Sequence, residues 1–251
     1  MWHKPQLLTA IADLLLLIGV AVLVGGGLLW ASRLPLFPLR EVAIAEPLRE
    51  TRRAEIEHAL KGQLRGNFFS VRPDQVRQAL EQLPWVRRAE VRRQWPGRLE
   101  VRIEEHEAVA RWGEGQAQLV NSHGEVFYGA TKALPPTVLF GPTGSAPEVL
   151  QRFREFARVL APTGRTPQQV TLSPRLAWRI RLDDGMAIEL GREQPKAPLL
   201  ARLERFAGAY GEAVAARASR PAEADLRYPN GFALRLAGLN APAGGELRGH
   251  P

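Results

Sequence analysis

An apolar stretch near the amino terminus constrains this chain more than any other feature. Leu14–Trp30 contains no charged side chain, and the wider stretch Leu7–Trp30 would form a helix of about 36 Å at about 1.5 Å per residue. That length exceeds the roughly 30 Å hydrocarbon core of a bilayer. We therefore predict a transmembrane helix over residues 14–32, preceded by a short cytoplasmic tail at residues 1–13.

The residues that flank this stretch bear on where it begins and how it is oriented. Asp13 would cost about 3 kcal/mol at the bilayer centre, so we expect it at the cytoplasmic interface. A cleaved signal peptide is disfavoured, because the apolar core is long and no small-residue cleavage site follows it. Lys4 precedes the span while Arg33 and Arg40 follow it. Long domains are translocated largely regardless of such charges, and we expect the larger C-terminal part outside the cytoplasm.

The next segment has the pattern of a small α/β domain. Leu99, Val101 and Ile103 alternate with polar residues on one strand, and Pro96–Gly97 precedes them as a turn, which is typical of a β-hairpin. Apolar residues at helical spacing precede the hairpin. We predict a βααββ domain at residues 38–106, built from Arg40–Ile44, Arg52–Leu60, Pro73–Gln82 and the hairpin Val86–Glu104.

From Ala108 the pattern changes to short strands separated by turns, which marks a second domain at residues 107–236. Two amphipathic helices are predicted in it, Pro147–Leu160 and Pro198–Tyr210. The fold class is therefore α+β: one transmembrane helix, the βααββ domain, and a mostly antiparallel β domain with two flanking helices. The Gly/Ala/Pro-rich residues 237–251 are predicted to be a disordered tail. The strands predicted in the second domain are Ala108–Trp112, Ala117–Val120, Val126–Tyr128, Val170–Leu172, Ala177–Leu182, Met186–Leu190, Asp225–Tyr228 and Phe232–Leu236.

Catalytic and metal-binding chemistry finds little support in the residues. The chain has no cysteine, which removes disulfides, thiolate nucleophiles and cysteine-based metal sites. His58 and His106 lack a second ligand at helical or strand spacing. His123 follows Ser122 in a tight turn without an orienting acid. We predict no enzymatic activity, no metal, no cofactor and no small-molecule substrate.

The net charge of +8 comes mostly from arginine. A nucleic-acid-binding protein usually gathers such charge into one stripe or tail, whereas these arginines alternate with apolar residues in strands or lie beside acidic residues. We therefore predict no nucleic-acid partner, and we interpret most of this charge as solvated surface, with attraction to an acidic partner or to anionic surfaces as the alternative.

Without catalysis, the chain is expected to act by binding other chains. A terminal hairpin beside a disordered tail often leaves the last strand of a sheet unpaired on one side. Such an edge offers backbone N–H and C=O groups to an extended segment of a partner. Arg227 and Arg235 are expected on one face of this hairpin, with Leu226 and Tyr228 or Phe232 on the other.

Several motifs in one order resemble the FtsQ/DivIB family of bacterial cell-division proteins. LPWV, eight further residues and then WP is the most specific of them, and it lies in FFSVRPDQVRQALEQLPWVRRAEVRRQWPGRLEVRIEEHEAVARW. LVNSHGEVF, AWRIRLDDG and DLRYPNGFA follow in the family's order. The resemblance covers roughly Arg40–Leu236.

The resemblance implies a single-pass protein of the cell inner membrane, located at the division septum, with its N-terminus in the cytoplasm. A polypeptide-transport-associated (POTRA) domain and a β domain would both lie in the periplasm. Such a protein is a non-catalytic scaffold of the divisome, active in septation. It binds FtsB and FtsL and connects early division proteins to the machinery of septal peptidoglycan synthesis.

In the family, FtsB adds a strand to the edge formed by the last strand of the β domain. Arg175 resembles a second arginine that meets an acidic residue of the partner. The chain departs from the family after the final turn, where Arg235 and Leu236 stand in place of Gly and Trp, and Phe232 is the candidate aromatic replacement. The partner-binding positions that the resemblance implies are Arg175, Arg227, Tyr228, Asn230, Gly231, Phe232, Ala233 and Leu236.

Two other functions fit parts of the pattern. A POTRA-containing transport or outer-membrane assembly component would need a long run of barrel strands of about 10 residues each, and the chain ends too soon for that. A membrane-anchored peptidoglycan enzyme would need an acid–base pair, for which the sequence offers no candidate.

Overall fold

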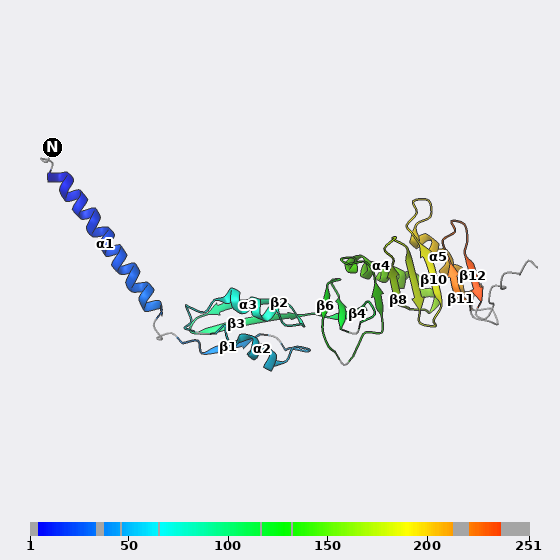
Figure 1. The fold of residues 1–251 in the computed structure, drawn as a ribbon, viewed down its shortest axis with the longest axis horizontal. Helices are drawn as coiled ribbons and strands as arrows, with labels where there is room; N and C mark the ends of the chain where they lie inside the picture. Colours follow the sequence, from blue (N-terminus) through cyan, green and yellow to red (C-terminus); the bar gives the residue numbers. More distant parts are fainter. Residues whose placement is uncertain are drawn as a thin grey trace, which may run out of the picture. The chain divides into compact units, whose positions relative to one another are not determined.

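A computed structural model of the chain describes residues 5–33, 38–45, 47–64, 66–115, 117–131, 133–212 and 221–236. The chain divides into two compact units, Met1–His106 and Glu107–Pro251. The tail predicted at residues 237–251 lies outside the described residues. Figure 1 traces the order of the elements along the chain.

The first element, α1, is a single helix that spans Pro5–Arg33. Within it, Thr9–Gly27 is long and apolar enough to cross a membrane by length and composition, and its described side chains are exposed rather than packed in a core. Among the described residues, no other helix meets this test. The apolar stretch thus forms a helix, as predicted.

The βααββ order predicted for the next segment is confirmed. Its three-stranded sheet has the order β1-β3-β2, in which β1 is parallel and β2 antiparallel to β3. Pro73 begins α3, where a missing N–H costs nothing, and the buried side chains of Val76 and Leu80 face the sheet core with Leu99 and Val101. The elements are β1 (Glu41–Ile44), α2 (Arg53–Leu60), α3 (Pro73–Glu81), β2 (Val86–Gln94) and β3 (Arg98–Glu105).

One carboxylate at the end of β3 fixes the start of the first helix in this unit. Glu105 accepts backbone N–H groups from Arg49 at 2.7 Å, from Thr51 at 2.6 Å and from Glu50 at 3.2 Å. Backbone donors ahead of a helix otherwise have no partner, so Glu105 holds the segment that leads into α2.

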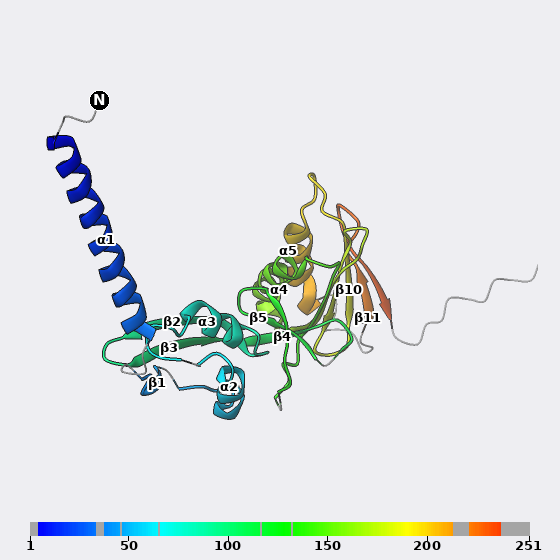
Figure 2. The ribbon, with the colours of Figure 1, turned by 60° about the vertical axis from the view of Figure 1, so that its left-hand side comes forward.

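The second unit contains one nine-stranded sheet of the order β12-β11-β10-β9-β8-β7-β4-β5-β6. Helices α4 and α5 pack on one face of this sheet and contact each other (Figure 2). Most neighbouring strands are antiparallel, while the pairs β4/β7, β7/β8 and β10/β11 are parallel. The strands are β4 (Ala108–Trp112), β5 (Gln118–Asn121), β6 (Val126–Tyr128), β7 (Val138–Phe140), β8 (Pro167–Leu172), β9 (Trp178–Leu182), β10 (Ala187–Gly191), β11 (Pro221–Asp225) and β12 (Ala233–Leu236), and the helices are α4 (Ala146–Leu160) and α5 (Leu199–Tyr210).

The core of this unit lies between the helices and the sheet. Phe156 of α4 stacks edge-on against Trp178 of β9, with ring centroids 5.8 Å apart, and Phe206 of α5 does the same with Tyr210 at 5.7 Å. These rings fill the space between layers with large apolar groups. Both predicted helices are confirmed as the elements that cover the sheet.

One strand of this unit was not predicted, and one was predicted at the wrong residues. Strand β7, Val138–Phe140, was not predicted; it is short and lies between prolines, so its sequence looks like a loop. The strand predicted at Asp225–Tyr228 lies earlier, at Pro221–Asp225, and Tyr228 lies in the turn that follows. The turn is accordingly longer than Pro229–Gly231, the residues that separate the two predicted strands.

Candidate functional site

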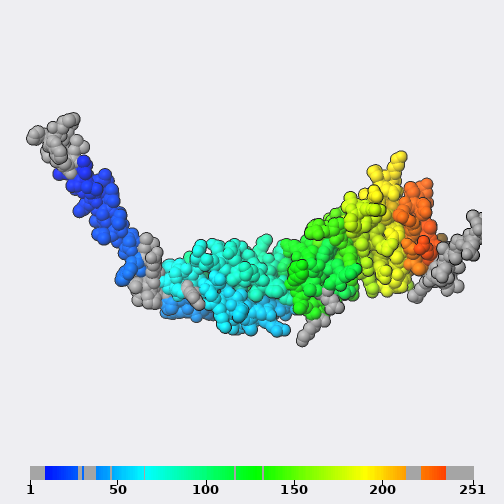
Figure 3. All heavy atoms as spheres, in the orientation of Figure 1, coloured from blue at the N-terminus to red at the C-terminus, as the bar shows by residue number. Residues whose placement is uncertain are grey.

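Strand β12, the last strand among the described residues, forms one end of the nine-stranded sheet. Among the described residues, β12 pairs only with β11, in antiparallel register with Ala233 opposite Asp225 and Arg235 opposite Glu223. In the space-filling view of Figure 3 the residues of β11 and β12, coloured orange, are visible at the surface. In the described part of the chain, the side of β12 turned away from β11 is therefore an edge.

The hydrogen-bond direction along β12 follows from its neighbours. The N–H of Leu226, the residue that follows β11, donates to the carbonyl of Glu189 in β10 at 2.8 Å. Leu226 and every second residue before it in β11 therefore direct their backbone groups toward β10. The residues between them, Glu223 and Asp225, direct theirs toward β12. Opposite residues in an antiparallel pair share this alternation. Ala233 and Arg235 consequently face β11, while Leu234 and Leu236 direct their N–H and C=O groups to the edge.

One face of this edge is anchored in the core. Leu226 is buried, and Leu234 is packed against the same core cluster. The ring of Phe232 lies edge-on to Phe206 of α5, with centroids 5.4 Å apart. Phe232, the predicted replacement for the family's aromatic residue, thus faces α5 and fixes the start of β12.

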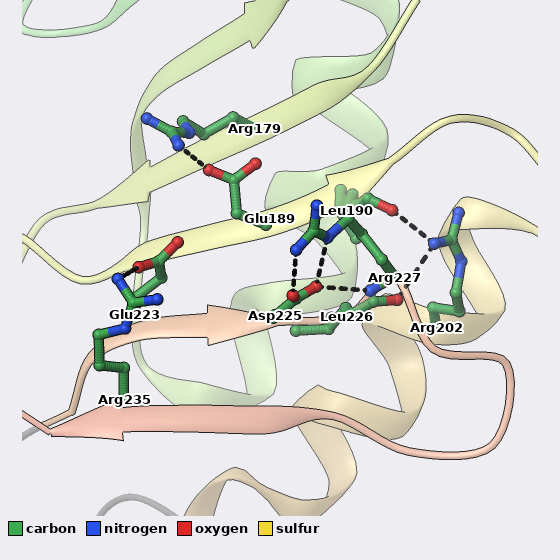
Figure 4. Close-up of polar contacts among 9 residues, drawn as sticks. All are labelled: Arg179, Glu189, Leu190, Arg202, Glu223, Asp225, Leu226, Arg227 and Arg235. Carbon is green, nitrogen blue, oxygen red and sulfur yellow. Dashed lines mark hydrogen bonds and ion pairs between the residues drawn. The ribbon is translucent and has the colours of Figure 1, made fainter. Parts of the chain in front are cut away.

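The opposite face carries a row of ion pairs across four strands (Figure 4). Arg179 of β9 pairs with Glu189 of β10, and Arg235 of β12 pairs with Glu223 of β11 at 3.1 Å. The guanidinium of Arg227 binds Asp225 with two bonds, from Nε at 2.8 Å and from Nη2 at 2.5 Å. These three arginines therefore each meet a carboxylate within the sheet.

The hydrogen-bonded pair of Arg227 and Asp225 shifts the pKa of both side chains. The hydrogen bonds from Arg227 lower the pKa of Asp225, and the same bonds raise the pKa of Arg227. The backbone N–H of Arg227 also donates to Asp225 at 3.0 Å. The stem of Arg227 lies over Gly191, which has φ +70; a Cβ at Gly191 would stand 2.9 Å from Cγ of Arg227. A glycine is required there for both reasons.

A buried arginine of α5 supports the turn from the inside. The guanidinium of Arg202 donates to the carbonyls of Leu190 at 2.5 Å, Leu226 at 3.1 Å and Arg192 at 2.7 Å. Figure 4 shows Arg202 reaching from α5 to the ends of β10 and β11. Nearby, Nη1 of Arg205 donates to the carbonyl of Pro229 at 2.7 Å. Helix α5 thus holds the turn at two points.

The structure brings most predicted site residues to one end of the sheet. Tyr228 is 56% exposed, and Asn230 is exposed beside it in the same turn. Arg175 is exposed in the turn between β8 and β9, where the N–H of Leu176 donates to the carbonyl of Ser173 at 2.9 Å. Strand β9 begins opposite Gly191, at the end of the sheet where β11 ends and β12 begins. Arg175 and Tyr228 therefore share that end.

Sequence reasoning did not single out the groups that organise this end: Asp225, Glu223, Gly191 and Arg202. The sequence did contain a signal for the role of Asp225, because Asp225 and Arg227 are two residues apart and so lie on one face of an extended chain. The role of Arg202 had no local signal, since all its acceptors are backbone carbonyls of distant strands.

Ser122 and His123, for which the sequence suggested a turn and no catalytic role, lie in a turn. Ser122 Oγ is 3.4 Å from His123 Nδ1, and the side chain of Asn121 accepts the N–H groups of His123 at 3.0 Å and Glu125 at 2.9 Å. This arrangement closes a turn after β5. Among the described residues, no group of three His, Asp or Glu side chains is placed to hold a metal ion.

Comparison with known proteins gives two family matches. Residues 37–106 match the FtsQ-type POTRA domain, and residues 110–227 match the C-terminal domain of the cell division protein FtsQ/DivIB. The second match ends at Arg227, ahead of the exposed turn and β12.

Full-length relatives agree with these matches. The chain is similar to proteins named "Cell division protein FtsQ" from three bacteria. It is 41% identical to that of Burkholderia pseudomallei, with 95% of this chain and 96% of the relative covered, and 37% identical to that of Bordetella pertussis, with 95% and 94% covered. The identity to that of Nitrosospira multiformis is 38%, with 94% and 99% covered. Together with the helix α1 that fits a single-pass membrane protein, these matches show that the chain belongs to the FtsQ/DivIB family of cell division proteins.

Proposed function

We propose that this chain is a non-catalytic scaffold of the divisome that binds FtsB and FtsL through strand addition to β12. In this role it connects early division proteins to the machinery of septal peptidoglycan synthesis. The observation that carries the proposal is the position of β12, which among the described residues is paired on one side only. The role of the family in cell division supports a partner from the division machinery.

The main chain of β12 provides the ladder for the partner strand. The N–H and C=O groups of Leu234 and Leu236 point to the edge, while the ring of Phe232 holds the strand against α5. A partner segment in extended conformation would add a tenth strand. In this mode of recognition, backbone hydrogen bonds supply affinity and side-chain pockets supply specificity.

The side chains at the turn end of the sheet supply the specific contacts. Tyr228 presents an exposed ring with a polar hydroxyl, a combination that is common at protein interfaces. Asn230 and Gly231 lie beside it, and Ala233 begins the strand. Arg175 forms no ion pair among the described residues, and so its guanidinium is available to a carboxylate of the partner.

For Arg227 we infer a role that differs from the partner contact implied by the resemblance. Its guanidinium is already bound by both oxygens of Asp225. An acidic partner residue would have to share or displace that bond. We therefore assign Arg227 to the support of the turn, from which Tyr228 projects, and Arg175 to the pairing with the partner's carboxylate.

The location follows from the same proposal. Helix α1 would anchor the chain in the inner membrane with the N-terminus in the cytoplasm. The POTRA-type unit and the β domain would lie in the periplasm, at the division septum. The support for this placement is the apolar Thr9–Gly27 segment together with the family assignment.

Site-specific photo-crosslinking in dividing cells tests the proposal directly. A photoreactive residue is placed at Tyr228, and a matched control is placed at His58, which is exposed on α2 of the other unit. We expect FtsB to be trapped at Tyr228 and not at His58. Capture of FtsB at His58 alone, with none at Tyr228, would contradict the assignment of the β12 edge and move the binding face to the POTRA-type unit.

A further inference from the structure

An aromatic cluster stands at one tip of the POTRA-type unit. Trp95 is 63% exposed at the end of β2, and Phe69 is 45% exposed in the segment ahead of α3. Both rings contact the buried Phe68, with centroids 5.8 Å and 5.3 Å away. We call Phe68, Phe69 and Trp95 the aromatic tip. A cluster of exposed aromatic rings commonly marks a surface that contacts another protein or a membrane.

The aromatic tip is held in a defined conformation. Nη2 of Arg93 donates to the carbonyl of Val71 at 2.6 Å and to that of Phe69 at 3.2 Å. The side chain of Asn67 accepts the N–H of Phe69 at 3.1 Å. These bonds fix the backbone that carries Phe69, so the exposed rings are presented by an ordered surface and not by a loose loop.

The aromatic tip lies beside the point where the chain enters this unit. The N–H of Arg40 donates to the carbonyl of Gly97, in the turn after Trp95, at 2.8 Å. A Cβ at Gly97 would stand 2.8 Å from the carbonyl oxygen of Pro38. The turn therefore packs directly on the first described residues after α1.

Chain length limits how far the aromatic tip can move from the end of α1. Helix α1 ends at Arg33, and Pro38 follows five residues later. A chain of five residues spans at most about 18 Å even when fully extended. Whatever the orientation of the unit, this entry point and the turn packed on it stay within about that distance of the helix end.

The charges around the aromatic tip favour an anionic surface. Arg92 pairs with Glu90 at 3.3 Å, and Arg98 pairs with Glu41 at 2.8 Å. Arg40 and Arg93 add two further cations, and each is exposed. Four arginines against two glutamates leave an excess of two positive charges. Anionic lipid headgroups attract such basic groups when they lie close to a membrane.

We propose that the aromatic tip inserts into the headgroup region of the membrane that α1 spans. Trp and Phe suit this interface because their rings enter the apolar layer while the polar groups around them stay hydrated. The contact would fix the POTRA-type unit against the bilayer surface. It is independent of the strand addition proposed for β12, because it involves the other unit and needs no protein partner.

Nitroxide labelling of the full chain in lipid nanodiscs tests this proposal. The natural chain has no cysteine, so a single substitution gives a unique labelling site. The test site is Gln94→Cys, next to Trp95, and the matched control is Arg88→Cys. Both positions are exposed and lie on the same strand β2, about 20 Å apart. The nanodiscs contain phosphatidylethanolamine and phosphatidylglycerol.

We expect the label at Gln94 to be several-fold less accessible to a water-soluble nickel chelate than the label at Arg88, and more accessible to oxygen. Adding Phe69→Ser and Trp95→Ser should return the Gln94 label to the accessibility of the control. Equal accessibility at the two sites in the chain with its natural aromatic residues would overturn the proposal, whether or not the double serine variant folds. Shielding of the label at position 94 from water in cells but not in nanodiscs would also overturn the proposal, because a protein and not the lipid would then cover the aromatic tip.

Discussion

Arg202 of α5 donates a hydrogen bond from Nη1 to the carbonyl oxygen of Leu226 at 3.1 Å, although its side chain is only 2% exposed. The same guanidinium also binds the carbonyls of Leu190 and Arg192. One buried cation thus joins the core helix to the ends of β10 and β11, immediately ahead of the turn that carries the candidate interaction site.

Replacing this arginine should destabilise the β domain strongly. Arg202→Met keeps an apolar stem but leaves three carbonyl groups without their donor. Each buried polar group without a partner costs about 1–3 kcal/mol, so we expect a loss of about 3 kcal/mol or more in the free energy of unfolding. The measurement is chemical denaturation of the full chain, followed by tryptophan fluorescence. Arg205→Met, which removes an exposed donor to one carbonyl from the same helix, is the control and should cost much less. Equal losses would show that Arg202 is not the main support of the turn.

The pair of Asp225 and Arg227 predicts a dependence on pH. Hydrogen bonds from Arg227 lower the pKa of Asp225 in the folded state, relative to about 3.9 in an unfolded chain. The pair therefore contributes stability that is fully present above the unfolded pKa and is lost as the pH falls through the folded pKa. In Arg227→Ala the pKa of Asp225 should rise toward its ordinary value, as measured by NMR titration of its carboxyl carbon. An unchanged titration curve would mean that the ion pair does not persist in solution.

Tyr228 should matter for binding and little for folding. Tyr228→Ala removes an exposed ring, and surface substitutions usually change stability by no more than about 0.5 kcal/mol. A tyrosine buried in the core would instead cost about 3 kcal/mol. We expect the thermal unfolding midpoint to stay near that of the natural chain, while FtsB capture from solubilised membranes falls. A large drop in the midpoint would place the ring in the core, in conflict with its exposure.

Two proline variants separate the edge of β12 from its pairing with β11. Leu236→Pro removes an N–H that points to the edge, so it should weaken FtsB binding and leave the folded state nearly intact, because proline is tolerated on edge strands. Ala233→Pro removes an N–H that faces β11, so it should lower the unfolding midpoint as well. Binding assays and thermal melts of both variants provide the measurement. Full FtsB binding by Leu236→Pro would contradict strand addition at this edge.

Local patterns predicted the elements that are long or strictly periodic. The apolar stretch of α1 was recognisable by length, and the alternation of Leu99, Val101 and Ile103 predicted β3 with its buried face. The two helices that cover the large sheet were predicted for the same reason, because their apolar residues recur at a spacing of three or four. Where one face must be buried, the period of the sequence indicates the element.

Short strands and distant pairings were not accessible in this way. Strand β11 begins at Pro221 and buries Ala224, so its sequence lacks the bulky alternation that predicts a strand. Its parallel pairing with β10 depends on a connection through α5, and no local pattern encodes it. The ion pairs on the outer face follow from register, since Arg235 meets Glu223 only because their strands are aligned. The resemblance therefore directed attention to the terminal hairpin, while the arrangement of its charges required the structure.

The row of ion pairs on the outer face also bears on how fast a partner can associate. Electrostatic steering over a distance depends on uncompensated charge and weakens as ionic strength rises. Arg179, Arg227 and Arg235 are each paired with a carboxylate within the sheet, so these three arginines add little to the field that a distant partner meets. Arg175 forms no ion pair among the described residues, so the dependence of the association rate on salt should come from charges such as this one and not from the row of ion pairs.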